Sequence, residues 1–164
     1  MSRLYRLFYV RVTYNVTELA PQPVLEAIVP FTYSSRLEDV VVPSRLSLMV
    51  FDAACVVYQE RDAKVMVLAG EQSYRAHPET TGDVLKAVAP DEIDPSNIVV
   101  LRDDDHLLRN TAYQVDALVD HFNSGHTVTI VCWGFHKRRI EKGLKSHGEA
   151  APQVEFVFAE DVIE

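Results

Sequence analysis

A histidine and a row of cations follow directly after a strongly apolar run near the end of the chain. Residues 127–131 are rich in β-branched side chains, which indicates a buried strand, and a helical pattern follows them. The first turn of that helix carries His136 and the basic residues 137–139. Ligands of α/β proteins bind beyond the carboxyl ends of the strands. The segment therefore predicts a ligand site, but it does not specify a reaction.

His136 is the leading candidate for chemistry in this segment. An imidazole titrates near neutral pH, so it is suited to general acid or base catalysis or to binding an anion. A histidine at a helix start can instead simply bond to the backbone. Arg138 and Arg139 lie on different faces of a helix, and we expect Arg139, three residues after His136, to be the one near the site. Trp133 precedes the helix and either stacks on a ring of the ligand or packs as a core or lid aromatic.

Three more loops follow predicted strands, at residues 32–36, 70–75 and 103–110. In a doubly wound sheet these loops share one edge, so we expect them to converge with the loop at 133–139 on a single site. Thr32 would contribute to ligand binding from the first of these loops. This convergence is a stronger argument than any single residue.

Two of these loops contain further candidate residues. Gly70 permits close approach of the backbone to a ligand. Glu71 is a candidate catalytic carboxylate, with a solvated charge as the alternative. Arg109, Asn110 and Thr111 stand at a predicted helix start, where Asn110 or Thr111 can cap the helix and backbone N–H groups can bind an anion.

The acidic tract at residues 103–106 resembles a metal cluster, but three consecutive acids more often form a solvated loop. Adjacent side chains rarely point at one centre, and the chain contains no CxxC, HExxH, EF-hand, P-loop, GxGxxG or GxSxG motif. We therefore predict no metal site, and the common zinc, nucleoside triphosphate and serine-hydrolase chemistries are disfavoured.

Strand and helix patterns alternate along the chain. This alternation predicts an α/β fold, a Rossmann-like three-layer α/β/α arrangement with a mainly parallel, five-stranded or slightly larger sheet. Residues 32–43 are expected to form a loop, and residues 4–19 fit either a strand or an amphipathic helix. The helix at 44–60 should bury Leu48, Phe51, Ala54, Cys55 and Tyr58. The predicted strands are 24–31, 64–69, 97–101, 127–132 and 154–158, and the predicted helices are 44–60, 78–89, 110–123 and 135–146.

The composition is that of one ordinary globular domain of 164 residues, with 48% hydrophobic and 24% charged residues. A formal net charge of −8 argues against general nucleic-acid binding and against adsorption to anionic membranes. No apolar stretch approaches the roughly 20 residues that span a bilayer, and no signal peptide is recognisable. Cys55 and Cys132 lie in apolar runs, which predicts buried free thiols and a reduced, cytoplasmic setting.

Four short motifs together resemble the DUF218 family, also called the SanA/ElyC/YdcF-like family. Ser44-Arg45 matches a helix start of that family, and residues 67–71 match a strand that ends in glycine. Residues 109–111 match its Asn-Thr helix start, and residues 132–139 match its His-x-x-Arg element, which pairs His136 with Arg139. The resemblance covers about residues 24–160 of a single domain spanning 1–164, with residues 1–20 as an N-terminal extension.

The chain departs from this family at three strand ends. Phe31, Thr32 and Tyr33 stand where relatives carry glycines, Ala69-Gly70 replaces a glycine pair, and Cys132-Trp133 replaces Thr-Ser. These larger side chains suggest a modified ligand. The resemblance implies an S-adenosylmethionine-type ligand for the unanchored branch of the family and a role in cell-envelope biogenesis for its anchored members.

Three functions follow as hypotheses. The first is a small-molecule enzyme, a transferase or hydrolase, that acts on an anionic or nucleotide-like ligand in a tailoring step of specialised metabolism. The second is a non-catalytic sensor of a nucleotide or of S-adenosylmethionine, or an accessory protein of cell-envelope metabolism. The third is an interaction protein with a degenerate site, in which the aromatic N-terminal segment forms a dimer interface or simply packs on the core. Monomer and homodimer both stay open.

Overall fold

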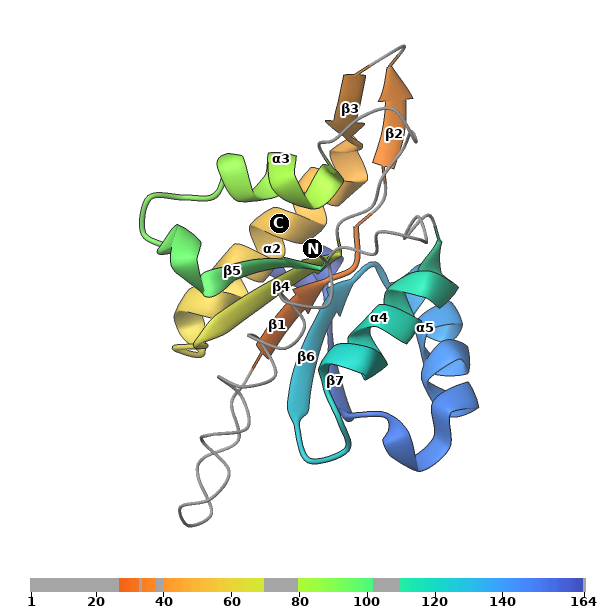
Figure 1. Cartoon of the computed structure of the whole chain (residues 1–164). Helices are drawn as coiled ribbons and strands as arrows, with labels where there is room; N and C mark the ends of the chain where they lie inside the picture. Colours follow the sequence, from red (N-terminus) through yellow and green to blue (C-terminus); the bar gives the residue numbers. More distant parts are fainter. Residues whose placement is uncertain (1–26, 33, 38–39, 70–79, 102–109, 164) are drawn as a thin grey trace, which may run out of the picture.

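Five parallel strands form one sheet in the order β5-β4-β1-β6-β7 (Figure 1). The computed structural model describes residues 27–32, 34–37, 40–69, 80–101 and 110–163. Its all-parallel sheet with helices confirms the predicted α/β fold of Rossmann-like type. The strands of this sheet are β1 (Ala27–Pro30), β4 (Val65–Ala69), β5 (Ile98–Leu101), β6 (Thr127–Cys132) and β7 (Gln153–Phe158).

The helices cover both faces of this sheet, because alternate strand residues point to opposite sides. Ile28 packs in one cluster, whereas its neighbours Ala27 and Val29 pack in another. The face that Ile28 joins is covered by α2 (Arg45–Glu60), α3 (Thr81–Ala87) and α6 (Ala159–Val162). The opposite face is covered by α4 (Thr111–His121) and α5 (Gly134–His147). The two short 3-10 helices are η1 (Pro95–Asn97) and η2 (Gly148–Ala150).

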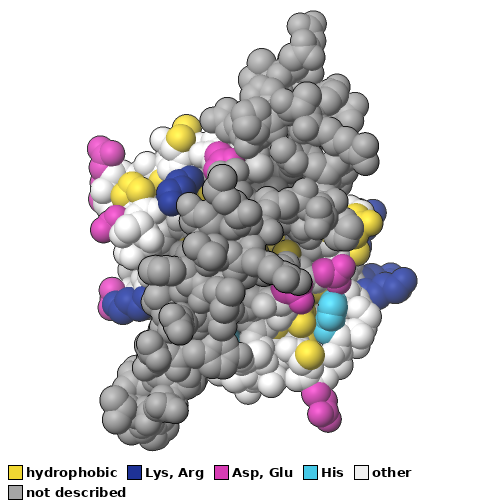
Figure 2. All heavy atoms as spheres, in the orientation of Figure 1, with side chains coloured by type: hydrophobic (Ala, Val, Ile, Leu, Met, Phe, Trp, Pro, Cys, Tyr) yellow, Lys and Arg dark blue, Asp and Glu magenta, His cyan; other side chains and the backbone are white. Residues whose placement is uncertain are grey.

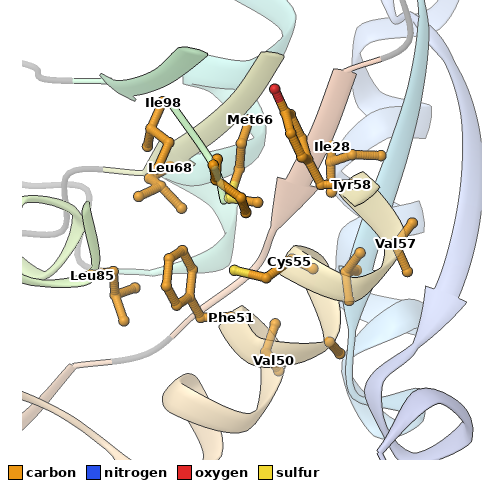
Figure 3. Close-up of a cluster of buried hydrophobic side chains, with 14 of the residues drawn as sticks. Ile28, Val50, Phe51, Cys55, Val57, Tyr58, Met66, Leu68, Leu85 and Ile98 are labelled. Carbon is orange, nitrogen blue, oxygen red and sulfur yellow. The ribbon is translucent and has the colours of Figure 1, made fainter. Parts of the chain in front are cut away.

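The core on the α2 side is built from one broad face of that helix (Figure 3). Phe51, Cys55 and Tyr58 of α2 face the strand residues Met66 and Leu68. The predicted apolar face is wrong at Leu48, which is 38% exposed. The buried stripe is centred on positions 47, 50, 54 and 57–58, so Leu48 lies at its rim.

Capping residues set the starts of α2 and α3 and the end of α5. Ser44 accepts a hydrogen bond from the amide of Ser47 at 3.1 Å and starts α2. Thr80 and Asp83 form a reciprocal capping box that starts α3. Gly148 adopts a φ of 57° at the end of α5, a conformation that favours glycine.

Residues 32–43 do not form the predicted loop. They contain an antiparallel hairpin of β2 (Ser34–Leu37) and β3 (Val40–Pro43), which pairs Ser34 with Pro43 and Leu37 with Val40. The hairpin projects beyond the sheet at the top of Figure 1. The β-branched run at 40–42 favours extended backbone, and a two-residue connection suits a hairpin. The two strands pair with each other and not with the main sheet.

Both cysteines are free and buried, as predicted. Burial raises the pKa of Cys55 and of Cys132 to about 12, so neither thiol ionises near neutral pH. In the ranges that the structure describes, no helix combines the length and the apolar character that crossing a membrane requires. The predictions for residues 4–19, 70–75 and 103–106 fall outside those ranges.

Candidate functional site

The order of the strands reverses at β1, and this reversal defines the candidate site. The chain passes from β1 to β4 and β5 on one side, and then returns to β6 and β7 on the other side. In open parallel sheets such a switch point is where ligands bind, beyond the carboxyl ends of the two central strands. Here these strands are β1 and β6. Their pairing continues past β1, since the amide of Phe31 donates to the carbonyl of Val131 at 2.9 Å.

Two helix starts meet at this edge. The hydroxyl Oγ1 of Thr111, the first residue of α4, lies 2.8 Å from Nε2 of His136, in the first turn of α5. This is a hydrogen bond of ordinary length for these atoms. His136 is 1% exposed, whereas Thr111 is half-buried. The edge of Phe31 faces the imidazole, with ring centroids 6.3 Å apart and planes at 83°.

His136 is electrically neutral at physiological pH. Burial, and to a smaller extent the nearby charge of Arg139, lowers the pKa of His136 from 6.5 to about 4. A charged imidazolium that holds an anion therefore does not fit this environment. A neutral ring that exchanges a hydrogen bond with the Thr111 hydroxyl does fit it.

Gln114, which is not among the residues predicted from the sequence, completes the polar cluster. Its side-chain amide donates to the carbonyl oxygen of Thr32 at 3.2 Å, and both residues are buried. Gln114 lies three residues after Thr111 on the same face of α4. A polar residue inside the apolar stripe of Val115 and Leu118 was a signal that could have identified it.

The starts of both helices are capped by the protein itself. Asn110 Oδ1 accepts from the amides of Ala112 and Tyr113 at 3.0 and 3.2 Å, so this residue caps α4. The amide of Gly134, at the start of α5, donates to Glu160 Oε1 at 2.8 Å. These donors already have acceptors, so the positive end of each helix is less accessible to an external anion than that of an uncapped helix.

The remaining predicted residues fall into two groups. Trp133 is half-buried and packs against the α2 side of the core, and its indole N–H donates to the carbonyl of Leu46 at 3.2 Å. Arg139 is exposed and acts on His136 through its charge. The structure thus brings Thr32, Thr111 and His136 to one edge. Gly70, Glu71 and Arg109 lie outside the described residues.

The described part of the chain contains no cluster of potential metal ligands. Across the described ranges, histidine, cysteine and carboxylate side chains form no group of three or more that could hold a metal ion.

No family model, curated protein or solved structure matches this chain. The resemblance to the DUF218 family therefore stays a prediction that rests on the four short motifs.

Proposed function

We propose that the protein binds an anionic or nucleotide-like small molecule at the carboxyl edge of β1 and β6. The observation that carries this proposal is the 2.8 Å hydrogen bond between Thr111 and His136, two residues from different helices that meet at the switch point of the sheet. A polar cluster of this kind, held by a packed scaffold, is what small-molecule sites use to orient a ligand.

Thr111 and His136 differ in solvent exposure, and we therefore propose different roles for them. Thr111 is half-buried whereas His136 is buried, so we assign the contact with the ligand to the Thr111 hydroxyl. His136 is buried and orients the Thr111 hydroxyl through the hydrogen bond to its Nε2, which makes it a positioning residue. Arg139 supplies the nearest positive charge, since His136 itself is neutral. S-adenosylmethionine and adenine nucleotides are the first ligands to test, on the strength of the family resemblance.

Catalysis is a second candidate, and the same distance favours it. A hydroxyl within hydrogen-bond reach of a neutral imidazole is the geometry of a nucleophile and its base. Thr111 Oγ1 would attack an electrophilic centre of the ligand while His136 Nε2 accepts the hydroxyl proton. The bond from that centre to its leaving group would break, and the leaving group would take the proton from His136. Water, in a hydrolase, or a second substrate, in a transferase, would then release the group held on Thr111. A pKa of about 4 makes His136 a weak base, so binding is the better supported function.

Calorimetry and thermal shift with S-adenosylmethionine and adenosine monophosphate test the binding proposal. Thr111→Val removes the hydroxyl at nearly constant volume and should weaken binding by about tenfold. Thr127→Val is the matched control, because Thr127 begins β6 at the opposite edge of the sheet. Binding to the control should equal that of the wild type.

Two results would contradict the proposal. One is that neither ligand raises the melting temperature of the wild type. The other is that the Thr111 and Thr127 variants bind with equal affinity. If a ligand is consumed, activity that disappears in Thr111→Val and survives in Thr111→Ser would favour catalysis over binding alone.

A further inference from the structure

The outer surface of α5 concentrates positive charge in an acidic protein. Five of the 16 lysines and arginines of the chain lie between residues 137 and 145, and Glu141 is the one carboxylate in this interval, whereas the whole chain has a net charge of −8. Basic side chains project at the right-hand margin of Figure 2, on the side where α5 lies in Figure 1. The five basic residues are Lys137, Arg138, Arg139, Lys142 and Lys145.

Most of this charge is not neutralised by the described residues. Lys137 pairs with Glu141 at 3.6 Å and lies over the rings of Phe156 and Phe158, 5.4 and 5.8 Å from their centroids. Among the residues with described positions, no carboxylate forms an ion pair with Arg138, Lys142 or Lys145. Like charges so close together repel one another, and an anionic partner would relieve that repulsion.

Four of the five basic side chains, all except Arg139, line a hollow of about 630 Å³ together with Gly134 and Glu141. Every described residue that lines this hollow belongs to α5, so no second element from the described part of the chain closes over it. Small-molecule sites bury most of their ligand. A hollow on one helix cannot do this, and it is better suited to a partner that lies along the surface.

An exposed apolar group lies at the start of the same helix. Phe135 is 68% exposed and lies nearly parallel to Trp133, with 10° between the ring planes. The indole of Trp133 is bonded to the backbone of Leu46, whose side chain is 44% exposed. Phe135 is three residues before Arg138, and therefore on a neighbouring part of the helix surface. Aromatic residues beside arginine are typical of the centres of protein interfaces.

We propose that a surface formed by Phe135, Arg138, Lys142 and Lys145 of α5, together with Leu46 at the start of α2, docks a short acidic peptide segment of a partner protein. The 14 residues of α5 span about 21 Å, which an extended segment of about six residues matches. The segment would place an apolar side chain against Phe135 and Leu46, and carboxylates along the basic residues.

The charge distribution favours such a segment over a long polyanion. A nucleic acid or an anionic bilayer would extend beyond α5 and meet the rest of a protein whose net charge is −8. A short acidic segment meets only the basic patch.

A fluorescent peptide with one phenylalanine followed by five alternating glutamates and aspartates provides the test, read by anisotropy at low salt. Lys142→Glu should weaken binding by about tenfold. The matched control is Lys64→Glu, which changes the net charge by the same amount at an exposed site directly before β4, where Lys64 pairs with Asp62. This variant should bind the peptide like the wild type. Phe135→Ala should also weaken binding, and Thr111→Val should not, because this surface is independent of the proposed ligand site.

Four outcomes would overturn the proposal. The first is that the wild type does not bind the peptide. The second is that Lys64→Glu and Lys142→Glu bind equally, which would indicate attraction without a defined surface. The third is tighter binding to a DNA duplex or to vesicles of phosphatidylcholine and phosphatidylserine than to the peptide. The fourth is a wild-type dimer in sedimentation that Phe135→Ala and Lys142→Glu dissociate, which would make a second copy the occupant.

Discussion

The two faces of α5 differ in almost every physical property. The inner face places His136 and Ile140 in the core, at 1% and 0% exposure, and packs Gly143 against Val115 of α4. The outer face carries the exposed Phe135 and a row of cations around a hollow. Substitutions on the buried inner face should therefore change the stability of the fold. Substitutions on the exposed outer face should change binding and leave stability almost unaffected.

Ile140→Ala should produce the largest effect. Ile140 is fully buried between α5 and the sheet, so the truncation should lower the free energy of unfolding by about 2–5 kcal/mol. Lys142→Ala, two residues later on the outer face, should change it by less than about 0.5 kcal/mol. Urea denaturation measures both values. Similar losses in the two variants would remove the contrast between the faces.

Acid should destabilise the protein through His136. The pKa of this residue is about 4 in the folded protein, below its ordinary value of 6.5, so the unfolded chain binds the proton first as the pH falls. Stability should be unaffected by His136 above pH 6.5 and should decrease between pH 6.5 and 4, by about 3 kcal/mol in total.

His136→Asn should abolish this part of the pH dependence. Burial also lowers the pKa of His121, which therefore contributes a decrease of its own, and the difference between wild type and variant isolates His136. Stability measured by denaturation from pH 7 to 4 provides the test. An NMR titration in which His136 protonates near pH 6.5 would contradict the buried, neutral imidazole.

Gly143→Ala should lower the free energy of unfolding by a smaller amount, because two opposing effects partly cancel. A Cβ at this position would lie 3.1–3.2 Å from three side-chain atoms of the buried Val115, so the helices would have to separate slightly. The gain in helix propensity, about 1 kcal/mol, offsets part of this strain. We expect a net loss of about 1 kcal/mol in thermal or urea unfolding.

Gly125→Ala is the control for Gly143→Ala. Gly125 lies in an exposed turn, where a Cβ would lie 3.2 Å from the exposed side-chain oxygen of Asn123. That oxygen can move, so this variant should be nearly neutral. A larger loss at Gly125 than at Gly143 would show that the approach of α4 to α5 is not tightly packed.

Much of the fold was predictable because its signals are local. The β-branched run at 127–131 and the start of a helix at Ser44 are signals of neighbouring residues, and each gives the element that the sequence predicts. The hairpin at 34–43 was missed because both strands are only four residues long and pair outside the main sheet. The prediction that Leu48 is buried was wrong because the spacing of apolar residues indicates the centre of the buried face of a helix but not how far that face extends around it.

The candidate site was predictable only as a location. The alternation of strands and helices was sufficient to place Thr32, Thr111 and His136 at one edge of a parallel sheet. The bond from Gln114 to Thr32 joins residues 82 positions apart, and no pattern in the sequence specifies that pairing. Trp133 had two open roles, and the structure shows it packed against the core with its N–H bonded to Leu46.

The sequence by itself determined the order of the elements, most of their ends and the basic character of α5, because periodicity, capping and charge are properties of neighbouring residues. Only the tertiary structure decided that His136 is buried and neutral, that Thr111 is its partner, and that four of the five cations of α5 lie around a hollow on its outer surface. These outcomes depend on how α4 and α5 pack on the sheet, and that packing sets both the solvation of His136 and its distance from a residue 25 positions earlier in the chain.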